Sequence, residues 1–182
     1  MRKQKFSEDF YRYYGREYRK REILKIILNH ELRFLFFFRK YQNSNNKFLK
    51  LFYKILLREI RLKYGIEIDP NIKIGKGFYM GHPFNITINS KAILGENINI
   101  HKGVTIGREN RGKRKGAPIL GNRIWIGINS TIVGKIKIGD NVLIAPNSYV
   151  NRDIPDNSIV IGNPCKIIES KEATKDYINN LV

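Results

Sequence analysis

The sequence predicts a mainly β domain, built as a triangular coil and preceded by a basic helical arm. The first observation is a period of six, in which apolar side chains recur at thirteen positions across residues 68–150. With 42% of the chain apolar, and with the register chosen freely on both sides of the break, such a series would arise by chance roughly once in 2000 sequences. Glycine often follows these positions, as at Gly75, Gly121 and Gly139, and the surplus of positive charge gathers before residue 65.

The repeat runs in two stretches separated by a polar break. The first stretch is Ile68, Ile74, Met80, Ile86, Ala92, Ile98 and Val104, and the second is Leu120, Ile126, Ile132, Ile138, Ile144 and Val150. A period of six fits neither an amphipathic helix nor an alternating strand. It fits a hexapeptide that forms one short strand and one turn. Three hexapeptides then close a coil of about 18 residues, and stacked coils bury the apolar positions.

The break between the stretches, GRENRGKRKG at 107–116, is too polar to lie inside such a prism. We expect residues 107–117 to protrude from one corner as a loop, and long loops in compact domains are usually functional. The coil domain spans residues 65–168 and ends in a closing extended stretch. Residues 169–182 are expected to form a short C-terminal helix.

Residues 1–64 carry 18 Lys and Arg against 6 Asp and Glu, which accounts for +12 of the net charge of +18. They predict a helix over 7–40 and a second helix over 48–63 that ends at Gly65. The basic and apolar stripes of these helices suit either an anionic bilayer surface or packing within the protein. No nucleic-acid recognition motif accompanies the charge, so nucleic acid is not expected as a partner.

The cysteine content and the apolar runs indicate a compartment. The single cysteine, Cys165, leaves no intrachain disulfide and fits a reducing environment. No secretory leader is recognisable, and no apolar run approaches the roughly 18 residues that span a bilayer. These features predict a cytoplasmic protein, with peripheral contact of residues 1–64 to the inner membrane face left open.

The chain has three histidines, of which His82 and His101 fall at coil corners. They are 19 residues apart, so a coil of about 18 residues places them on one side at adjacent levels. A metal site needs at least three protein ligands, and no third His or Cys lies nearby, so no metal is expected. A histidine acts best as a general base when a carboxylate orients it, which makes Glu67 a candidate partner of His82. Spacing alone leaves that pairing open.

Residues 65–168 resemble the hexapeptide-repeat acyltransferases, which fold as left-handed parallel β-helices. The matching segments are IDPNIKIGKGFYMGH at 68–82, AILGENINIHKGVTIG at 92–107, IWIGINSTIVGKIKIGDNVLIAPNSYV at 124–150 and IGNPCKI at 161–167. Their order is similar to that in the branch that holds the serine acetyltransferases and the O-acetyltransferases of bacterial surface polysaccharides.

The resemblance implies a mechanism and a site. His82 would deprotonate the acceptor hydroxyl, Glu67 would orient its ring, and the alkoxide would attack the thioester of acetyl-CoA directly. His101 and Asn85 would contact the acceptor. The CoA of this family lies in a groove between the subunits of a homotrimer. Its predicted contacts are Gly107, Arg108, Gly127, Ile128, Ala145, Pro146 and Lys166, and the basic loop could meet its phosphates.

Two departures from the serine acetyltransferases bear on the acceptor. Those enzymes carry Asp at the position of Gly81 and a second His at that of Ala117, and both residues serve the amino-acid substrate. We therefore expect the acceptor to be a sugar hydroxyl of a capsular or exopolysaccharide, free or as a lipid-linked glycan. The alternative is a serine O-acetyltransferase of cysteine biosynthesis. Alternatives of other classes are a non-catalytic anion-binding scaffold and a metal-dependent lyase or hydratase resembling the trimeric carbonic anhydrases.

Overall fold

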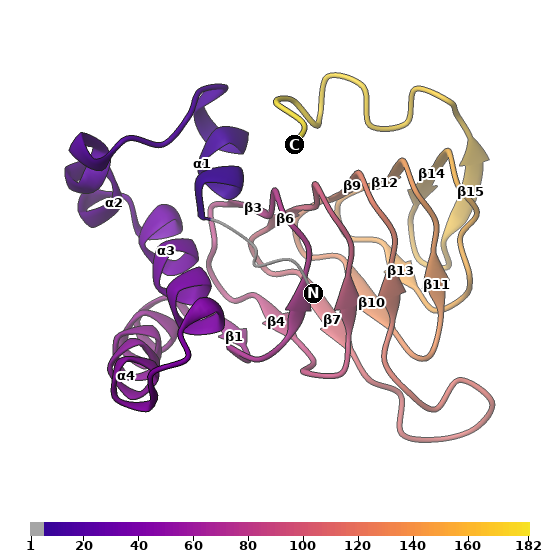
Figure 1. Ribbon diagram of the computed structural model, residues 1–182. Coiled ribbons are helices and arrows are strands. Elements are labelled where there is room, and N and C mark those ends of the chain that lie inside the picture. Colours follow the sequence, from indigo (N-terminus) through magenta and orange to yellow (C-terminus); the bar gives the residue numbers. More distant parts are fainter. Residues whose placement is uncertain (1–5) are drawn as a thin grey trace.

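A computed structural model describes residues 6–182, so the first five residues of the predicted arm lie outside the described residues. A helical arm packs against the first turn of a parallel β-helix (Figure 1). The C-terminal tail leaves the last turn and returns along one side of the coil toward the arm (Figure 1). The described part of the arm and the C-terminal tail therefore both meet the first turns of the coil, where the candidate histidines lie.

The arm contains four α-helices and a short 3-10 helix. They are α1 (Phe6–Tyr14), η1 (Lys20–Glu22), α2 (Ile23–Leu28), α3 (His30–Asn43) and α4 (Lys47–Tyr64). None of these described helices is both long and apolar enough to cross a membrane. The prediction of an unbroken helix over 7–40 is wrong. The chain leaves the helical conformation at Gly15, where φ is +61°. Helical structure resumes with η1 and α2, and α3 begins after Asn29, whose side chain caps it by accepting a hydrogen bond from Leu32 N.

The second predicted helix is confirmed, and α4 exceeds it by one residue at each end. The Asn46 side chain accepts hydrogen bonds from the backbone N–H groups of Phe48 and Leu49. At the other end Gly65 takes the left-handed conformation, which costs glycine little and ends the helix.

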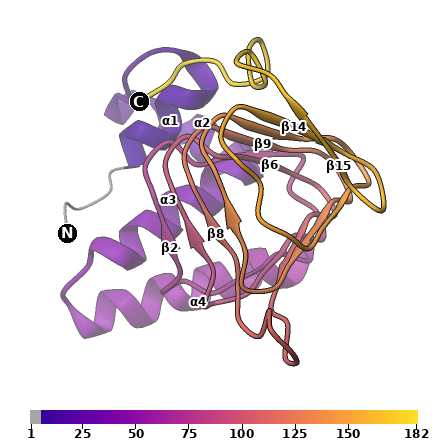
Figure 2. The ribbon, with the colours of Figure 1, turned by 90° about the vertical axis from the view of Figure 1, so that its right-hand side faces the viewer.

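The strands form three flat sheets that make the sides of a triangular prism (Figure 2). The first sheet holds β1 (Glu67–Ile68), β4 (Thr87–Ile88), β7 (Thr105–Gly107), β10 (Thr131–Val133) and β13 (Tyr149–Val150). The second holds β2 (Lys73–Ile74), β5 (Ile93–Leu94), β8 (Ile119–Leu120) and β11 (Lys137–Ile138). The third holds β3 (Tyr79–Gly81), β6 (Asn99–His101), β9 (Ile124–Ile126), β12 (Val142–Ile144), β14 (Ser158–Ile161) and β15 (Lys166–Glu169). Only the pairing of β14 with β15 is antiparallel among the described strands.

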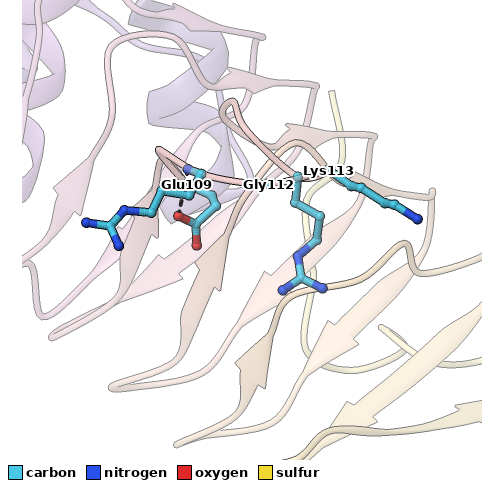
Figure 3. A pocket seen from close by; sticks show the side chains of 5 residues that line it. Glu109, Gly112 and Lys113 are labelled. Atoms are coloured by element: carbon cyan, nitrogen blue, oxygen red, sulfur yellow. Dashed lines mark hydrogen bonds between the residues drawn. The ribbon is translucent and has the colours of Figure 1, made fainter.

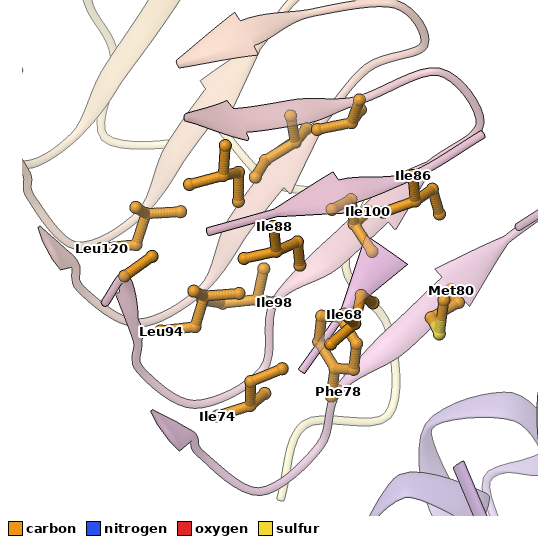
Figure 4. Packing of buried hydrophobic residues seen from close by; sticks show 14 of the residues in the cluster. Ile68, Ile74, Phe78, Met80, Ile86, Ile88, Leu94, Ile98, Ile100 and Leu120 are labelled. Atoms are coloured by element: carbon orange, nitrogen blue, oxygen red, sulfur yellow. The ribbon is translucent and has the colours of Figure 1, made fainter. Parts of the chain in front are cut away.

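All thirteen positions of the predicted period are buried, which confirms the origin of the repeat (Figure 4). The pairing of strands between the first two turns differs from the expected 18 residues per turn. Glu67 pairs with Thr87, so the first turn has 87 − 67 = 20 residues. Thr87 pairs with Thr105, so the next turn has the expected 105 − 87 = 18. Ile68 therefore stacks under Ile88, although Ile86 is buried as well. The two extra residues lie between β3 and β4, in the corner that contains His82.

The predicted loop at 107–117 is confirmed. It leaves the coil between β7 and β8, and it separates Thr105 from its partner Thr131 by 131 − 105 = 26 residues. Glu109 and Gly116 exchange two backbone hydrogen bonds of 2.9 Å, which close the base of the loop. The loop is therefore an addition to a regular turn of the coil.

A buried ion pair ties the arm to the coil. Arg39 of α3 donates to both oxygens of Asp9 in α1, at 2.7 and 3.1 Å. The same guanidinium donates to the carbonyl oxygens of Ile74 and Gly75, at 2.9 and 2.6 Å. Asp9 also accepts from the backbone N–H of Phe78 at 2.9 Å. Because the charges and their remaining bonding positions are satisfied together, the arm and the first turn pack as one body.

The predicted C-terminal helix over 169–182 is wrong. Strand β15 extends to Glu169, and the tail beyond it is a series of turns. Asn97 bonds both the backbone N–H and the carbonyl of Val182, and Asn99 donates to the carbonyl of Tyr177. Asparagine side chains on the coil thus satisfy backbone groups that a helix would have satisfied internally.

Candidate active site

His82 occupies the enlarged corner after β3 with an exposed ring and a left-handed backbone, φ 50°. The corner is held from the arm. The Glu31 carboxylate accepts a hydrogen bond from the backbone N–H of His82 at 3.0 Å. Asn85 N donates to the carbonyl of Tyr64, also at 3.0 Å. These contacts from α3 and α4 set the path of the corner and leave the imidazole free.

An aromatic contact supports the same corner. The ring of Phe84 lies 5.5 Å from the ring of His30 and 5.3 Å from that of Tyr64, centre to centre. His30 and Tyr64 in turn stack at 4.7 Å. His30 is therefore part of the packing between the arm and the corner.

His101 ends the strand above, and its ring lies over Gly81. Its Nδ1 is 2.9 Å from the carbonyl oxygen of Ile126, so Nδ1 carries the proton and Nε2 is left as an acceptor. A Cβ at Gly81 would lie 2.6 Å from Cδ2 and 2.8 Å from Nε2 of this ring. Burial lowers the pKa of His101, the nearby His82 lowers it further, and the Ile126 carbonyl opposes both. These effects favour a neutral imidazole.

Two predicted site residues make other contacts. Glu67 accepts a long hydrogen bond of 3.5 Å from the hydroxyl of Thr87, and no hydrogen bond joins it to His82 in the part of the chain that the structure describes. The side-chain oxygen of Asn85 packs against Gly65, only 2.3 Å from where a Cβ would lie. Asn85 therefore helps to shape the junction between α4 and the coil.

Four of the predicted CoA contacts lie in one column above the histidines. Gly127 follows β9 and donates to the carbonyl of Ile144, and Ala145 follows β12 and donates to that of Val160, both at 2.8 Å. The next residue of each corner is Ile128 or Pro146. The remaining predicted contacts lie elsewhere. Gly107 ends β7 in the first sheet and Arg108 follows it, and Lys166 begins β15.

The protruding loop forms a basic hollow of its own (Figure 3). It is lined by Glu109, Arg111, Gly112, Lys113 and Arg114. The Glu109 carboxylate accepts from the backbone N–H groups of Asn110 and Arg111 at 2.8 and 3.1 Å. Among the described residues no ion pair neutralises the three basic side chains that line this hollow.

Sequence reasoning missed Glu31. It precedes His82 by 51 residues and sits in the first turn of α3, where an acidic residue is an ordinary helix feature. Nothing in the local pattern distinguishes it. Only the packing of the arm against the first turn reveals its contact with His82.

The bacterial transferase hexapeptide family, described by six repeats, matches residues 117–152. The match covers the later turns of the β-helix. Over 104 residues the chain is 38% identical to the serine acetyltransferase of Helicobacter pylori, covering 57% of this chain and 61% of that protein. Over 115 residues it is 35% identical to the serine acetyltransferase of Synechococcus elongatus, covering 63% and 47%. The chain thus spans between about half and two thirds of the length of these curated relatives.

A solved structure of similar fold is the serine acetyltransferase of Neisseria gonorrhoeae in complex with serine. It superposes with a TM-score of 0.69 at 27% identity, covering 90% of this chain and 67% of that one. The expected fold, a parallel β-helix of hexapeptide repeats preceded by a helical arm, is therefore confirmed.

The expectation of a polysaccharide acceptor is wrong. The curated relatives named above are serine acetyltransferases. The expectation relied on Gly81, where those enzymes carry Asp. The structure supplies another reason for glycine at this position, because the ring of His101 fills the space that a side chain would need. Gly81 is therefore no sign of a glycan acceptor.

Proposed function

We propose that this chain is an acetyl-CoA-dependent O-acetyltransferase whose acceptor is the hydroxyl of L-serine. The observation that carries the proposal is the corner of His82: an exposed imidazole on a backbone fixed by Glu31, below the column of Gly127 and Ala145. The names of the relatives supply the acceptor class.

In the proposed reaction the His82 imidazole accepts the proton of the serine hydroxyl as that oxygen attacks the thioester carbonyl. Backbone N–H groups at the corner stabilise the negative oxygen of the tetrahedral intermediate. The intermediate collapses to O-acetylserine, and the departing CoA sulfur takes the proton from the imidazolium. The chemistry is direct transfer, so Cys165, which is buried, has no part in it. Glu67, on the adjacent β1, is the proposed carboxylate that orients His82 when the site is occupied.

Around Gly81 the proposed acceptor site differs from that of the related enzymes. The neutral His101 offers Nε2 as a hydrogen-bond acceptor at the place where the related enzymes carry an Asp side chain. An ammonium group is a donor only, so it can bond to this nitrogen. His101 is the proposed contact of the serine ammonium, and Asn85 the proposed second contact at the same corner.

The proposed CoA groove runs along the column of corners, with Gly127, Ile128, Ala145 and Pro146 on one wall. Gly107, Arg108 and Lys166 lie away from this column in one chain. In a homotrimer, a neighbouring subunit could place its own copies of these three residues beside the column. We therefore propose a homotrimer with the groove between its subunits. The basic loop is the proposed contact of the CoA phosphates.

Helix α4 supports a peripheral membrane contact of the arm. Its exposed apolar side chains are Phe48, Leu49, Leu51, Phe52, Ile55 and Leu62, with Phe48 85% exposed. Exposed Lys47, Lys54 and Arg58 accompany them on the same helix. This combination suits an anionic bilayer surface. Sedimentation with vesicles of phosphatidylglycerol should recover the protein, vesicles of phosphatidylcholine should not, and replacing Phe48 and Phe52 by Ser should abolish recovery.

The test of the reaction is release of free thiol from acetyl-CoA by the purified chain with and without L-serine. We expect serine-dependent release, and a loss of about 10²–10⁴-fold in His82→Ala. Lys91→Ala, a change at an exposed corner away from the site, is the matched control and should retain full activity. No release with L-serine by a protein that binds acetyl-CoA would overturn the serine acceptor. Equal release by His82→Ala would overturn the base.

A further inference from the structure

The C-terminal tail covers a pocket on the outer face of the third sheet. The pocket has a volume of about 270 Å³ and lies between α1, the tail and strands β3, β6 and β9. The residues that matter for its chemistry are Arg12, Tyr79, Asn99, His101, Trp125 and Tyr177. His101 is the one residue that the pocket shares with the site described above.

Arg12 brings a buried positive charge to this pocket. It is only 4% exposed. Its Nε donates to the carbonyl of Asn179 at 3.1 Å, and its two terminal nitrogens donate to Oδ1 of Asn97 and of Asn99 at 3.3 and 2.5 Å. All these acceptors are neutral. Across residues 6–182 no carboxylate lies within ion-pairing distance of its guanidinium.

The charge of Arg12 therefore has no ion-pair partner among the described residues, and the Asp9 carboxylate acts on it only at longer range. Burial lowers its pKa to about 10, which leaves it charged at neutral pH. A guanidinium also has more N–H donors than the three acceptors use. A buried cation without a partner is costly, and an anion that enters the pocket would relieve that cost.

A row of aromatic rings also lines the pocket. The ring centres of Tyr79 and His101 lie 6.5 Å apart, those of His101 and Trp125 4.7 Å, and those of Trp125 and Tyr177 5.0 Å. The strands and the tail thus supply a continuous surface on which a flat apolar group can pack.

We propose that this pocket binds a small carboxylic acid, with its carboxylate on Arg12 and its body against the aromatic row. The volume of about 270 Å³ equals roughly nine liquid water molecules, enough for an acid of about ten non-hydrogen atoms. The single charge of Arg12 matches a monocarboxylate better than a phosphate dianion. The proposed contact of the carboxylate with Arg12 does not depend on the proposed transfer reaction, although His101 lines this pocket and is also the proposed contact of the serine ammonium.

Trp125 makes the proposal directly measurable, because it is the only tryptophan of the chain and lines the pocket. Its fluorescence should change saturably on titration with benzoate. Benzamide has the same shape without the charge and should cause no saturable change at concentrations up to about 10 mM. Arg12→Gln should weaken benzoate binding at least tenfold, and Arg12→Lys, which keeps the charge, should weaken it less.

A second variant keeps the test valid if Arg12→Gln loses its fold. Tyr177→Ala removes one ring from the half-exposed end of the row and leaves the buried charge in place. It should weaken benzoate binding several-fold, whereas Tyr149→Ala, on the first sheet, should have no effect. Equal responses to benzoate and benzamide, unchanged binding in a folded Arg12 variant, or preferential binding of inorganic phosphate would overturn the proposal.

Discussion

The imidazole of His101 stands over the Cα of Gly81, with Nε2 only 2.8 Å from where a Cβ would be. Gly81 and His101 are register partners in β3 and β6, so this contact follows from the stacking of one turn on the next. The backbone at Gly81 is not in the left-handed region, so its glycine is required by space and not by conformation.

The first prediction follows from this contact. Gly81→Asp should destabilise the fold by about 1–3 kcal/mol, because the new side chain overlaps a half-buried ring. Adding His101→Ala should remove most of that penalty. Urea unfolding of the two single variants and the double variant measures the coupling. Additive effects of the two changes would show that the ring does not limit residue 81.

The second prediction concerns Glu31 as a positioning residue. Glu31→Ala removes the acceptor for the backbone N–H of His82 and should lower kcat about tenfold, at a cost in stability of about 1 kcal/mol. Glu31→Gln keeps a side-chain carbonyl oxygen in reach and should restore most of the activity. The pH dependence of kcat should keep its shape in both variants if Glu31 acts only through the backbone. A Glu31→Gln enzyme as slow as Glu31→Ala would show that the negative charge matters.

The third prediction concerns the buried ion pair of the arm, in which Arg39 is 1% exposed. Arg39→Met should destabilise the protein by about 3–5 kcal/mol, because it leaves the Asp9 carboxylate buried without its partner. The double variant Asp9→Leu with Arg39→Met should recover part of the loss. Free energies of unfolding from urea titrations provide the comparison. A double variant less stable than Arg39→Met would mean that the bond from Phe78 N to Asp9 dominates.

The fourth prediction is a pH dependence of stability. The pKa of His101 in the folded protein is below its ordinary value of 6.5 because burial disfavours the charged ring. The unfolded chain therefore binds more protons than the folded protein between the lowered pKa and 6.5. This contribution to stability is present above pH 6.5 and is lost as the pH falls toward the lowered pKa.

Thermal unfolding of the protein and of His101→Gln, measured across this range, isolates the effect. Other groups titrate in both proteins, so the difference between the two curves reports His101. The stability of the unmodified protein should fall more steeply on acidification. Parallel curves would show that His101 titrates as an exposed histidine does.

The fifth prediction concerns the basic loop. Replacing Arg111, Lys113 and Arg114 by Gln should raise the KM for acetyl-CoA several-fold and leave kcat unchanged, because the proposed contacts of these side chains are with the CoA phosphates and not with the reacting atoms. The effect should diminish at high ionic strength. Steady-state kinetics in low and high salt measure it. The stability should be unaffected, since the loop is added to a complete turn; a large loss of kcat would place the loop in the reaction itself.

Much of the coil is legible in the sequence because its packing is local and repetitive. Each apolar position of the hexapeptide meets the equivalent position one turn away, so a single rule covers residues 68–150. Short segments also predict the polar loop and the end of α4 at Gly65. The candidate base at His82 likewise rests on a short segment, the one that resembles the family motif. The resemblance to serine acetyltransferases rests on this regular part.

The failures occur where long-range contacts compete with local patterns. Ile86 and Ile88 are both apolar, so the count by six cannot show which one stacks on Ile68, and the enlarged corner was missed. Asn97 and Asn99 hold the tail in turns, although its local sequence suggested a helix.

The sequence by itself determined the repeat, its interruption, the basic arm and the histidines that lie near one another, because each depends on spacing along the chain. The tertiary structure alone decided that Glu31 fixes the backbone of His82, that His101 excludes a side chain at Gly81, and that Arg12 and Trp125 share a pocket. These contacts join residues brought together by the docking of the arm and the tail. The energy of that docking depends on the whole packed surface, and no short segment encodes it.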